Sequence, residues 1–405
     1  MSALSRVVAA ILMIVFARRS QQDRGESLAF TTRGERARAP IVRFIVKHPF
    51  ATIGALSGFG IVVGALVMIS GVIPIKASSG HWAITAVLLD FAKRRSVATY
   101  SLAITSPPLD HEALIVHGAA HYVSGCEPCH GGPDGRIPPV MRAMTPPPPA
   151  LTTSVSRYNA RELFTIIKHG IKFTGMPAWP AQQRDDEVWA AVAFVQRLPQ
   201  LSAAEYHRLA YGDADVVSRG DSSPAAPAPE LARQICGRCH GADGVGRDGG
   251  AFPSLAGQQP AYLEASLRAF ADGRRFSGVM TPVATRLTDA MMRELAQYYA
   301  SLPVRRPSAA DPPRVAVGES IAAQGVGQRG IPACRECHGA IEPPKNPLYP
   351  RLAGQHAPYL AKQLQLLQRR QRGGSPQVNL MHAFVDRLEP DDIEAVTAYF
   401  SSRQR

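Results

Sequence analysis

The chain has 405 residues, of which 45% are hydrophobic and 19% charged, a composition that excludes a disordered protein. Its formal net charge is +13, and residues 1–49 carry nine Lys or Arg against three Asp or Glu, which gives +6 (9 − 3). Nucleic-acid binding therefore explains the charge poorly, and a basic tail that faces anionic lipid explains it better. Strand-like alternation is scarce, so we expect a mostly α-helical fold.

The first 49 residues form a basic N-terminal segment. Its one apolar run, Val7–Phe16, is bounded by Arg6 and by Arg18 and Arg19 and is too short to span a bilayer. The run is either the core of a signal peptide, although no small-residue cleavage site follows it cleanly, or a segment that lies on a membrane surface. The sequence leaves the role of residues 1–40 open.

Residues 50–75 are predicted to form a transmembrane helix. These 26 residues contain no charge and would measure about 39 Å as a helix, whereas a bilayer core needs roughly 20 residues. A buried helix of a soluble domain is the alternative, which the length of the run disfavours. Basic residues are concentrated before the run, and only Lys76 follows closely. The positive-inside rule then predicts a single-pass protein of the cytoplasmic (inner) membrane, with residues 1–49 in the cytoplasm and the rest in the periplasm.

Residues 76–107 are predicted to connect the membrane helix to the first domain. Within residues 78–102, a helical apolar face ends at a basic cluster, Lys93–Arg95. This segment either lies along the outer membrane surface or packs on the first domain, and the sequence does not decide between them. The apolar face consists of Ala83, Val87, Leu88, Phe91 and Ala92.

A five-residue pattern, Cys-x-x-Cys-His, then occurs three times and uses all six cysteines of the chain. Two cysteines three residues apart on one helical turn point the same way, so their sulfurs can reach the two vinyl groups of one haem. The histidine, one turn further, can ligate the iron. The pattern is typical of c-type haem attachment and predicts three covalent haems c. The predicted haem-binding residues are Cys126, Cys129, His130, Cys236, Cys239, His240, Cys334, Cys337 and His338.

Three other uses of such cysteine pairs explain the pattern less well. A zinc site needs four ligands in one place, and pairing two of the three equivalent motifs leaves one without a partner. A redox dithiol has no use for a histidine at the same place three times, and structural disulfides would not need it either.

A methionine follows each motif histidine after 40 to 46 residues, in a predicted loop before a final helix. A thioether opposite the histidine would complete the coordination of the iron and raise its potential. Core filling is the alternative for any one methionine, but the position recurs. Met141 and Met144 lie too near Cys129 to serve. The predicted axial ligands are Met176, Met280 and Met381, with His130, His240 and His338 on the other side of the iron.

Three histidines are other possible ligands. His382 could compete with its neighbour Met381. His169 and His356 are better explained by a surface position or a contact between domains.

The last two motifs belong to internal repeats. Pro253–Gln258 matches Pro350–Gln355 in the pattern Pro-x-Leu-Ala-Gly-Gln, and an apolar helix is expected after each. The expected middle helices are 161–170, 262–271 and 359–370, and the expected closing helices are 185–198, 286–299 and 387–400.

On these motifs the chain resembles the cytochrome c family of small helical haem domains. Residues 229–405 are similar to the two-haem cytochrome c4 group, and residues 108–200 to single-haem cytochrome c domains. The resemblance implies that the carbonyls of Pro253 and Pro350 accept hydrogen bonds from His240 and His338. The front half departs from that group, which has no third haem and need not have a membrane helix.

The sequence thus predicts one N-terminal transmembrane helix followed by three tandem cytochrome c-like domains. The first linker, rich in Pro, Ala, Ser and Asp, is the expected hinge. The predicted boundaries are 1–49 for the basic segment, 50–75 for the membrane helix, 76–107 for the connection, 108–200, 230–303 and 315–405 for the three domains, and 201–229 and 304–314 for the linkers.

The predicted function is electron transfer in a respiratory chain, with no catalytic residue. The protein would pass electrons from a membrane or periplasmic donor to a terminal acceptor such as an oxidase, in contact with membrane lipid and with no nucleic acid. The alternative is a cytochrome c subunit of a periplasmic dehydrogenase complex of the alcohol-dehydrogenase type. A haem enzyme such as a peroxidase needs an open iron position, and three available methionines argue against it.

Overall fold

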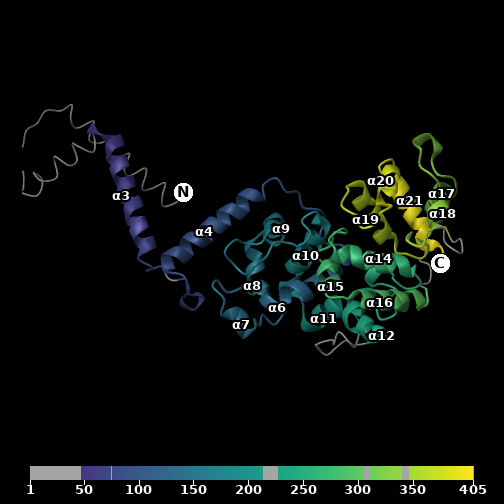
Figure 1. Cartoon of the computed structure of the whole chain (residues 1–405), viewed down its shortest axis with the longest axis horizontal. Helices are drawn as coiled ribbons and strands as arrows, with labels where there is room; N and C mark the ends of the chain where they lie inside the picture. Colours follow the sequence, from purple (N-terminus) through teal and green to yellow (C-terminus); the bar gives the residue numbers. More distant parts are fainter. Residues whose placement is uncertain (1–46, 74, 213–226, 305–310, 340–345, 405) are drawn as a thin grey trace, which may run out of the picture. The chain divides into compact units, whose positions relative to one another are not determined.

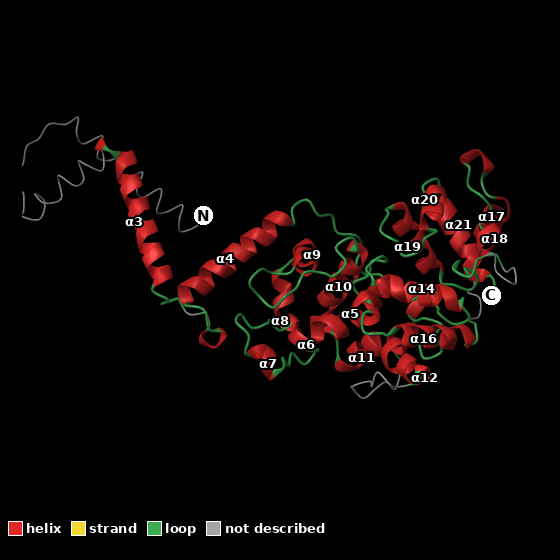
Figure 2. Cartoon of the chain, in the orientation of Figure 1, coloured by secondary structure: helices red, strands yellow, loops and turns green. Residues whose placement is uncertain are grey.

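The computed structural model describes residues 47–73, 75–212, 227–304, 311–339 and 346–404 (Figure 1). It divides the chain into two compact units, residues 1–76 and 77–405. The prediction of a mostly helical fold is confirmed, since no strand occurs among the described residues beyond one isolated bridge between Val326 and Ile331 (Figure 2). The apolar run Val7–Phe16 and most of the basic segment 1–49 lie outside the described residues.

In the first unit, helix α3 (Pro49–Ile69) is the one described helix that is long and apolar enough to cross a membrane. Its 21 residues span about 31 Å, and none is buried. The predicted end at Ile75 is wrong, because the helix stops at Ser70, where Gly71 adopts a positive φ of 68°. The shorter helix still meets the length that a bilayer core requires.

The second unit begins with a 3₁₀ turn (Ala77–Ser79) and helix α4 (Ala83–Tyr100). The helix was expected to end at the basic cluster Lys93–Arg95, but α4 continues through this cluster to Tyr100. Asp90 pairs with Lys93 and Arg94 at 2.9 Å each, and ion pairs at this spacing stabilise a helix. Val97 is buried, while the first half of α4 exposes its apolar residues. The helix therefore packs on the folded unit only through its second half.

The segment that contains the first motif is built on two crossing helices, α5 (Glu112–His121) and α10 (Asp185–Arg197). Gly118 of α5 lets the helices approach closely, because a Cβ there would overlap the carbonyl oxygen of Ala190. The other elements are a π-helical turn (Tyr122–Cys126), α6 (Glu127–His130), α7 (Pro139–Arg142), α8 (Leu151–Ser154), α9 (Ala160–His169), α11 (Ala203–Tyr211) and 3₁₀ turns at Val155–Arg157 and Leu198–Gln200.

The segments that contain the second and third motifs repeat this plan. In the third, α17 (Pro312–Gln324) crosses α21 (Pro390–Ser402) at Gly318, where a Cβ would overlap the Ala395 carbonyl oxygen. The remaining elements are α12 (Ala228–Leu231), a π-helical turn (Ala232–Cys236), α13 (Gly237–His240), α14 (Pro260–Ala271), α15 (Met280–Ala284), α16 (Asp289–Ser301), α18 (Arg335–His338), α19 (Ala357–Gln368), α20 (Val378–Val385) and 3₁₀ turns at Asp248–Gly250 and Gly327–Arg329.

The predicted middle and closing helices are observed, with ends that differ from the prediction by at most three residues. The predicted linker 201–229 is wrong at its start, because residues 203–211 form α11. A capping box of Ser202 and Glu205 starts this helix, and Tyr206, Leu209 and Ala210 are buried. The first motif's segment therefore extends to residue 211, and residues 213–226 of the linker that was expected to be the hinge lie outside the described residues.

The first and second segments share one hydrophobic core. Phe252, which comes from the second segment, is buried in the cluster formed by α5, α9 and α10. Phe276 also packs against this cluster. The two segments are therefore joined by apolar contact as well as by the chain.

We predict that Gly318→Ala destabilises the third segment. The added methyl group must push α17 away from α21, and overpacking of this kind costs about 1–3 kcal/mol. Urea unfolding of the detergent-solubilised protein should begin at a lower concentration. Gly327→Ala, in the same segment with no atom near the added methyl group, is the control. Equal unfolding curves for both variants would contradict the close approach.

Candidate functional site

Each motif forms a single helical turn. The turns are α6, α13 and α18, and the first cysteine immediately precedes each. The second cysteine and the histidine of a motif therefore lie within one short helical turn, and the first cysteine lies directly before it. All six thiols are free.

A proline carbonyl accepts a hydrogen bond from Nδ1 of every motif histidine. Because a carbonyl can only accept, Nδ1 carries the proton and Nε2 keeps its lone pair for a metal. The bonds at Pro253 and Pro350 were expected, and the one at Pro149 was not. The distances are 2.8 Å from His130 to Pro149, 3.0 Å from His240 to Pro253 and 2.9 Å from His338 to Pro350.

Burial sets the ionisation of the motifs. It lowers the pKa of all three motif histidines, partly opposed by the bond to the proline carbonyl. It also raises the pKa of Cys126 to about 12 and that of Cys236 to about 11. At neutral pH the imidazoles are therefore neutral, the form that binds a metal, and these thiols are protonated.

The donor geometry does not support a zinc site. A structural zinc site needs four ligands grouped in one place. Across the part of the chain that the structure describes, no three His, Cys, Asp or Glu side chains are grouped to hold a metal ion.

The second and third motifs line one large cavity. Its volume of about 1080 Å³ exceeds the range of roughly 300–1,000 Å³ usual for a pocket that holds one small ligand. Eight of the twelve predicted site residues are therefore brought together. They are Cys236, Cys239, His240, Met280, Cys334, Cys337, His338 and Met381; Cys126, Cys129, His130 and Met176 do not line it.

The predicted loop position is right for one of the three methionines. Met176 lies between α9 and α10, and its amide donates to Thr174 Oγ1 at 3.2 Å. Met280 is instead the first residue of α15, and Met381 lies inside α20. In α20 a mostly apolar stretch forms helical turns where a loop was expected.

The other ligand candidates are less well placed. His382 does not line the cavity that Met381 lines. His356 directs Nε2 to the carbonyl of Val245 at 2.9 Å, which is a contact between segments, as expected. His169 is exposed at the end of α9. Met141, set aside on sequence distance, lies with Sδ 3.8 Å from Cys129 Sγ and so contacts the first motif.

Two arginines and two tyrosines form a polar cluster on the cavity wall. Arg275 donates to the Tyr359 hydroxyl and Arg372 to the Tyr262 hydroxyl, both at 3.1 Å. Burial acts to raise the pKa of Tyr262, but the two arginines outweigh it and lower that pKa to about 7. Among the described residues, neither arginine has a carboxylate partner. Buried guanidinium groups need anions, so the cluster fits a ligand that carries carboxylates.

The second and third segments meet through a reciprocal pair of glutamines. Gln355 accepts from the amide of Ser254 and donates to its carbonyl, both at 2.9 Å. Gln258 accepts from the amide of Arg351 at 2.8 Å and donates to its carbonyl at 3.0 Å. These residues follow Pro253 and Pro350, so the contact is two-fold symmetric and adjoins both histidine bonds.

Comparison with known proteins agrees with this site. The profile of the family described as cytochrome c oxidase, cbb3-type, subunit III matches residues 113–195 and 223–298. The thiosulfate dehydrogenase electron acceptor of Thiomonas intermedia is 36% identical over 187 residues, which cover 45% of this chain and 83% of that protein. Cytochrome c4 of Thiocapsa roseopersicina is 38% identical over 170 residues, which cover 42% of this chain and 86% of that protein.

Two solved structures align with part of this chain. Reduced cytochrome c4 from Pseudomonas stutzeri, 30% identical, aligns with a TM-score of 0.41 and covers 44% of this chain and 97% of that one. Thiosulfate dehydrogenase from Marichromatium purpuratum, 36% identical, aligns with a TM-score of 0.39 and covers 46% of this chain and 38% of that one.

The extent of the sequence identity shows that this chain belongs to the cytochrome c family, whose members bind haem c covalently and transfer electrons. Within the family it resembles the cytochrome c4 group, as its repeats predicted.

Several residues of the site were missed from the sequence. Pro149 ends a run of four prolines, which hid its role. The Arg–Tyr cluster had a usable signal, because Tyr262 and Tyr359, like Arg275 and Arg372, are separated by the same 97 residues (359 − 262 and 372 − 275). The repeat comparison could have found both pairs.

Proposed function

We propose that this chain is a membrane-anchored periplasmic electron carrier with three covalent haems c, one at each Cys-x-x-Cys-His motif. The observation that carries the proposal is one geometry that occurs three times: a motif histidine whose Nδ1 is bonded to a proline carbonyl. One such histidine would be compatible with ordinary packing. Three of them, in motifs that use every cysteine, favour three haem units.

Haem c supplies reversible one-electron chemistry at its iron. The thiol pairs of the three motifs would hold the porphyrin through thioether bonds, and His130, His240 and His338 would each bind one iron. Met176, Met280 and Met381 would fill the opposite positions, which favours electron transfer over substrate binding. Arg275 and Arg372 would neutralise the carboxylates of the second and third haems.

The shared cavity supports direct exchange between the second and third haems. Their motifs line one space, and the reciprocal glutamines fix the two segments against each other. The protein would pass electrons between a membrane or periplasmic donor and a terminal acceptor such as an oxidase.

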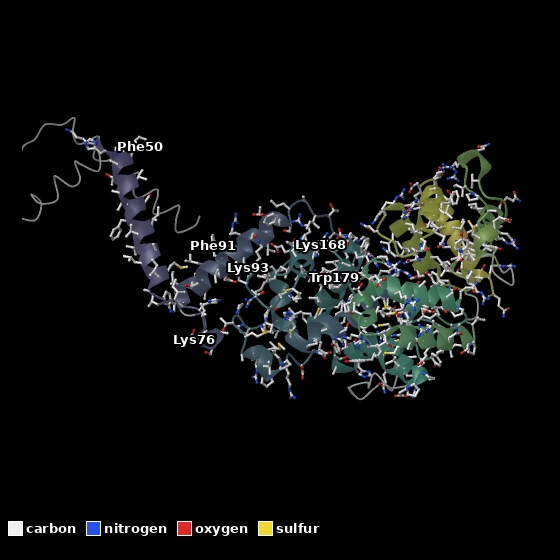
Figure 3. The ribbon with its side chains drawn as sticks, viewed as in Figure 1. Phe50, Lys76, Phe91, Lys93, Lys168 and Trp179 are labelled. Carbon is white, nitrogen blue, oxygen red and sulfur yellow. The ribbon has the colours of Figure 1, made fainter. Side chains whose placement is uncertain are left out.

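The apolar surfaces of α3 and α4 support membrane attachment. Ile84, Val87, Leu88 and Phe91 are 59–64% exposed and lie on one face of α4. Lys93 follows Phe91 on the same helix, where it could meet lipid headgroups (Figure 3). The first half of α4 would lie on lipid while its second half packs on the unit, so each of the two alternatives left open by the sequence would hold for one half of the helix.

The second candidate function is that of an electron-accepting subunit for a periplasmic dehydrogenase. Relatives named thiosulfate dehydrogenase electron acceptors favour a thiosulfate-oxidising partner over the alcohol-dehydrogenase type that the sequence suggested. A catalytic subunit that copurifies with this chain would support it.

We predict that protein matured in its native host carries three haems. Intact mass spectrometry should give the polypeptide mass plus three haem groups, because each motif supplies both attachment thiols. The bare polypeptide mass, or zinc in place of iron, would contradict the proposal.

We predict that Met280→Ala removes the sulfur-to-iron absorption of one haem and leaves the other two. Loss of the thioether should also lower the potential of that haem. Met292→Ala is the matched control, because Met292 is buried on α16 and does not line the cavity. If the Met280→Ala spectrum equals that of the wild type, Met280 is not a ligand.

We predict that cleavage at a protease site inserted after Ile75 releases a soluble red fragment with all three haems. Helix α3 is removed by this cut, so extraction without detergent tests whether it is the main anchor. A fragment that stays with the membrane would assign the anchoring to residues 78–102 instead.

A further inference from the structure

Glu187 is a buried acid whose contacts leave its own segment. It is the third residue of α10 and is 1% exposed. Ser277 Oγ donates to it at 2.7 Å and the amide of Gly278 at 2.6 Å. Both donors belong to the second segment and lie just before Met280. Burial raises the pKa of Glu187, while Arg184 and the two donated hydrogen bonds act in the opposite direction and favour the carboxylate form.

Two neighbours hold this carboxylate in place. Arg184 lies 3.0 Å from one of its oxygens and also donates to the carbonyl of Phe276 at 2.7 Å. Trp179 donates its indole N–H to the other oxygen at 3.4 Å. Arg184 and Glu187, at the start of α10, thus hold residues 276–278 by hydrogen bonds.

Ser277 connects Glu187 with Met280 by hydrogen bonds. The hydroxyl that donates to Glu187 accepts from the amides of Val279 at 3.2 Å and Met280 at 3.1 Å. Two hydrogen bonds therefore connect Glu187 with the backbone of Met280. Charge-assisted bonds are the stronger ones, and here they are shielded from water.

We infer that Glu187 is a positioning residue for the second haem site, which fixes the Met280 segment from the first segment and so makes the second iron's ligation depend on docking of the first segment. The inference rests on the proposed function in one respect, that Met280 is an axial ligand. In this inference, the first two haem units meet through residues close to their axial methionines, Met176 and Met280. Trp179, three residues after Met176, belongs to the same junction and lies among the packed helices (Figure 3).

The third segment shows that an acidic residue at the third position of the closing helix can have all its contacts within its own segment. Asp392 is also the third residue of its closing helix, α21, and is buried. It accepts from Arg329 at 2.6 and 2.9 Å and from the amide of Glu389 at 2.8 Å, all within its own segment. Helix capping alone therefore does not require the contacts of Glu187 with the second segment.

Close packing at Gly278 supports the same junction. A Cβ on this residue would lie 2.5 Å from Nε1 of Trp179, and the ring of Trp179 stacks edge-on against that of His121 at 4.5 Å. Gly278→Ala would therefore separate the segments sterically without removing a charge.

The test uses the full-length haem-loaded protein in detergent and four variants. Glu187→Ala removes both acceptor oxygens, and Glu187→Gln keeps one acceptor oxygen and the side-chain volume. Gly278→Ala disturbs the same contact from the second segment by adding a methyl group against Trp179. Asp392→Asn is the matched control for loss of a buried charge. The readouts are the number of haems, the sulfur-to-iron absorption, the ligand-methionine methyl signals in reduced-state NMR and the three midpoint potentials, with Met280→Ala identifying the second haem.

We expect Glu187→Ala and Gly278→Ala to weaken the sulfur-to-iron absorption of the second haem and lower its potential, with a smaller effect for Glu187→Gln. Asp392→Asn should leave the second haem unchanged. If Met280→Ala changes one haem but no Glu187 or Gly278 variant does, the positioning role is overturned and the proposed function stands. If Met280→Ala changes nothing, the ligand assignment fails and the positioning role with it. If Glu187→Ala fails to fold, Glu187→Gln and Gly278→Ala decide.

Discussion

The hydrogen bond from each motif histidine to a proline carbonyl is the constraint on which the site depends. It fixes the imidazole in one tautomer and leaves Nε2, with its lone pair, available to a metal. The short helical turn fixes the histidine relative to the thiols, and the carbonyl fixes its rotation. Because the proline lies 12 to 19 residues beyond the histidine, the bond also closes the loop that follows each motif.

The second and third segments use this loop for their contact. Gln258 and Gln355 each bond both backbone groups of the residue that follows the other segment's proline. The carbonyls that hold His240 and His338 are therefore one residue away from the groups that make the contact. The contact between the first and second segments has a different chemistry, with a shared apolar core and one buried carboxylate. The chain thus joins its segments by one symmetric and one asymmetric contact.

Local features were predictable from the sequence because they depend on near neighbours. The motif turns, the closing helices and the repeat of Pro253–Gln258 in Pro350–Gln355 need only spacing and composition. Helix α11 was also readable, from Ser202, Glu205 and the apolar positions after them, but the proline-rich stretch that follows obscured it. The early end of α3 follows from the backbone at Gly71, which hydropathy does not reveal.

Contacts between residues distant in sequence could not be predicted in this way. Nothing in the sequence near Glu187 indicates that its partner is Ser277, since an acid at a helix start is explained by the helix dipole alone. The contact of Pro149 with His130 was equally hidden, because the sequence does not distinguish Pro149 from the three prolines before it. The separation of 97 residues from Arg275 to Arg372 was visible in the sequence, but their hydrogen bonds to Tyr359 and Tyr262 came from the structure.

Helix α4 has a mechanical consequence. It is an unbroken rod of 18 residues, about 27 Å long, whose far end is embedded in the folded unit at Val97. A rod held at one end by packing and lying on a bilayer at the other would limit the tilt of the unit above the lipid. Under the proposed membrane attachment, redox partners would then meet the unit in a restricted range of orientations.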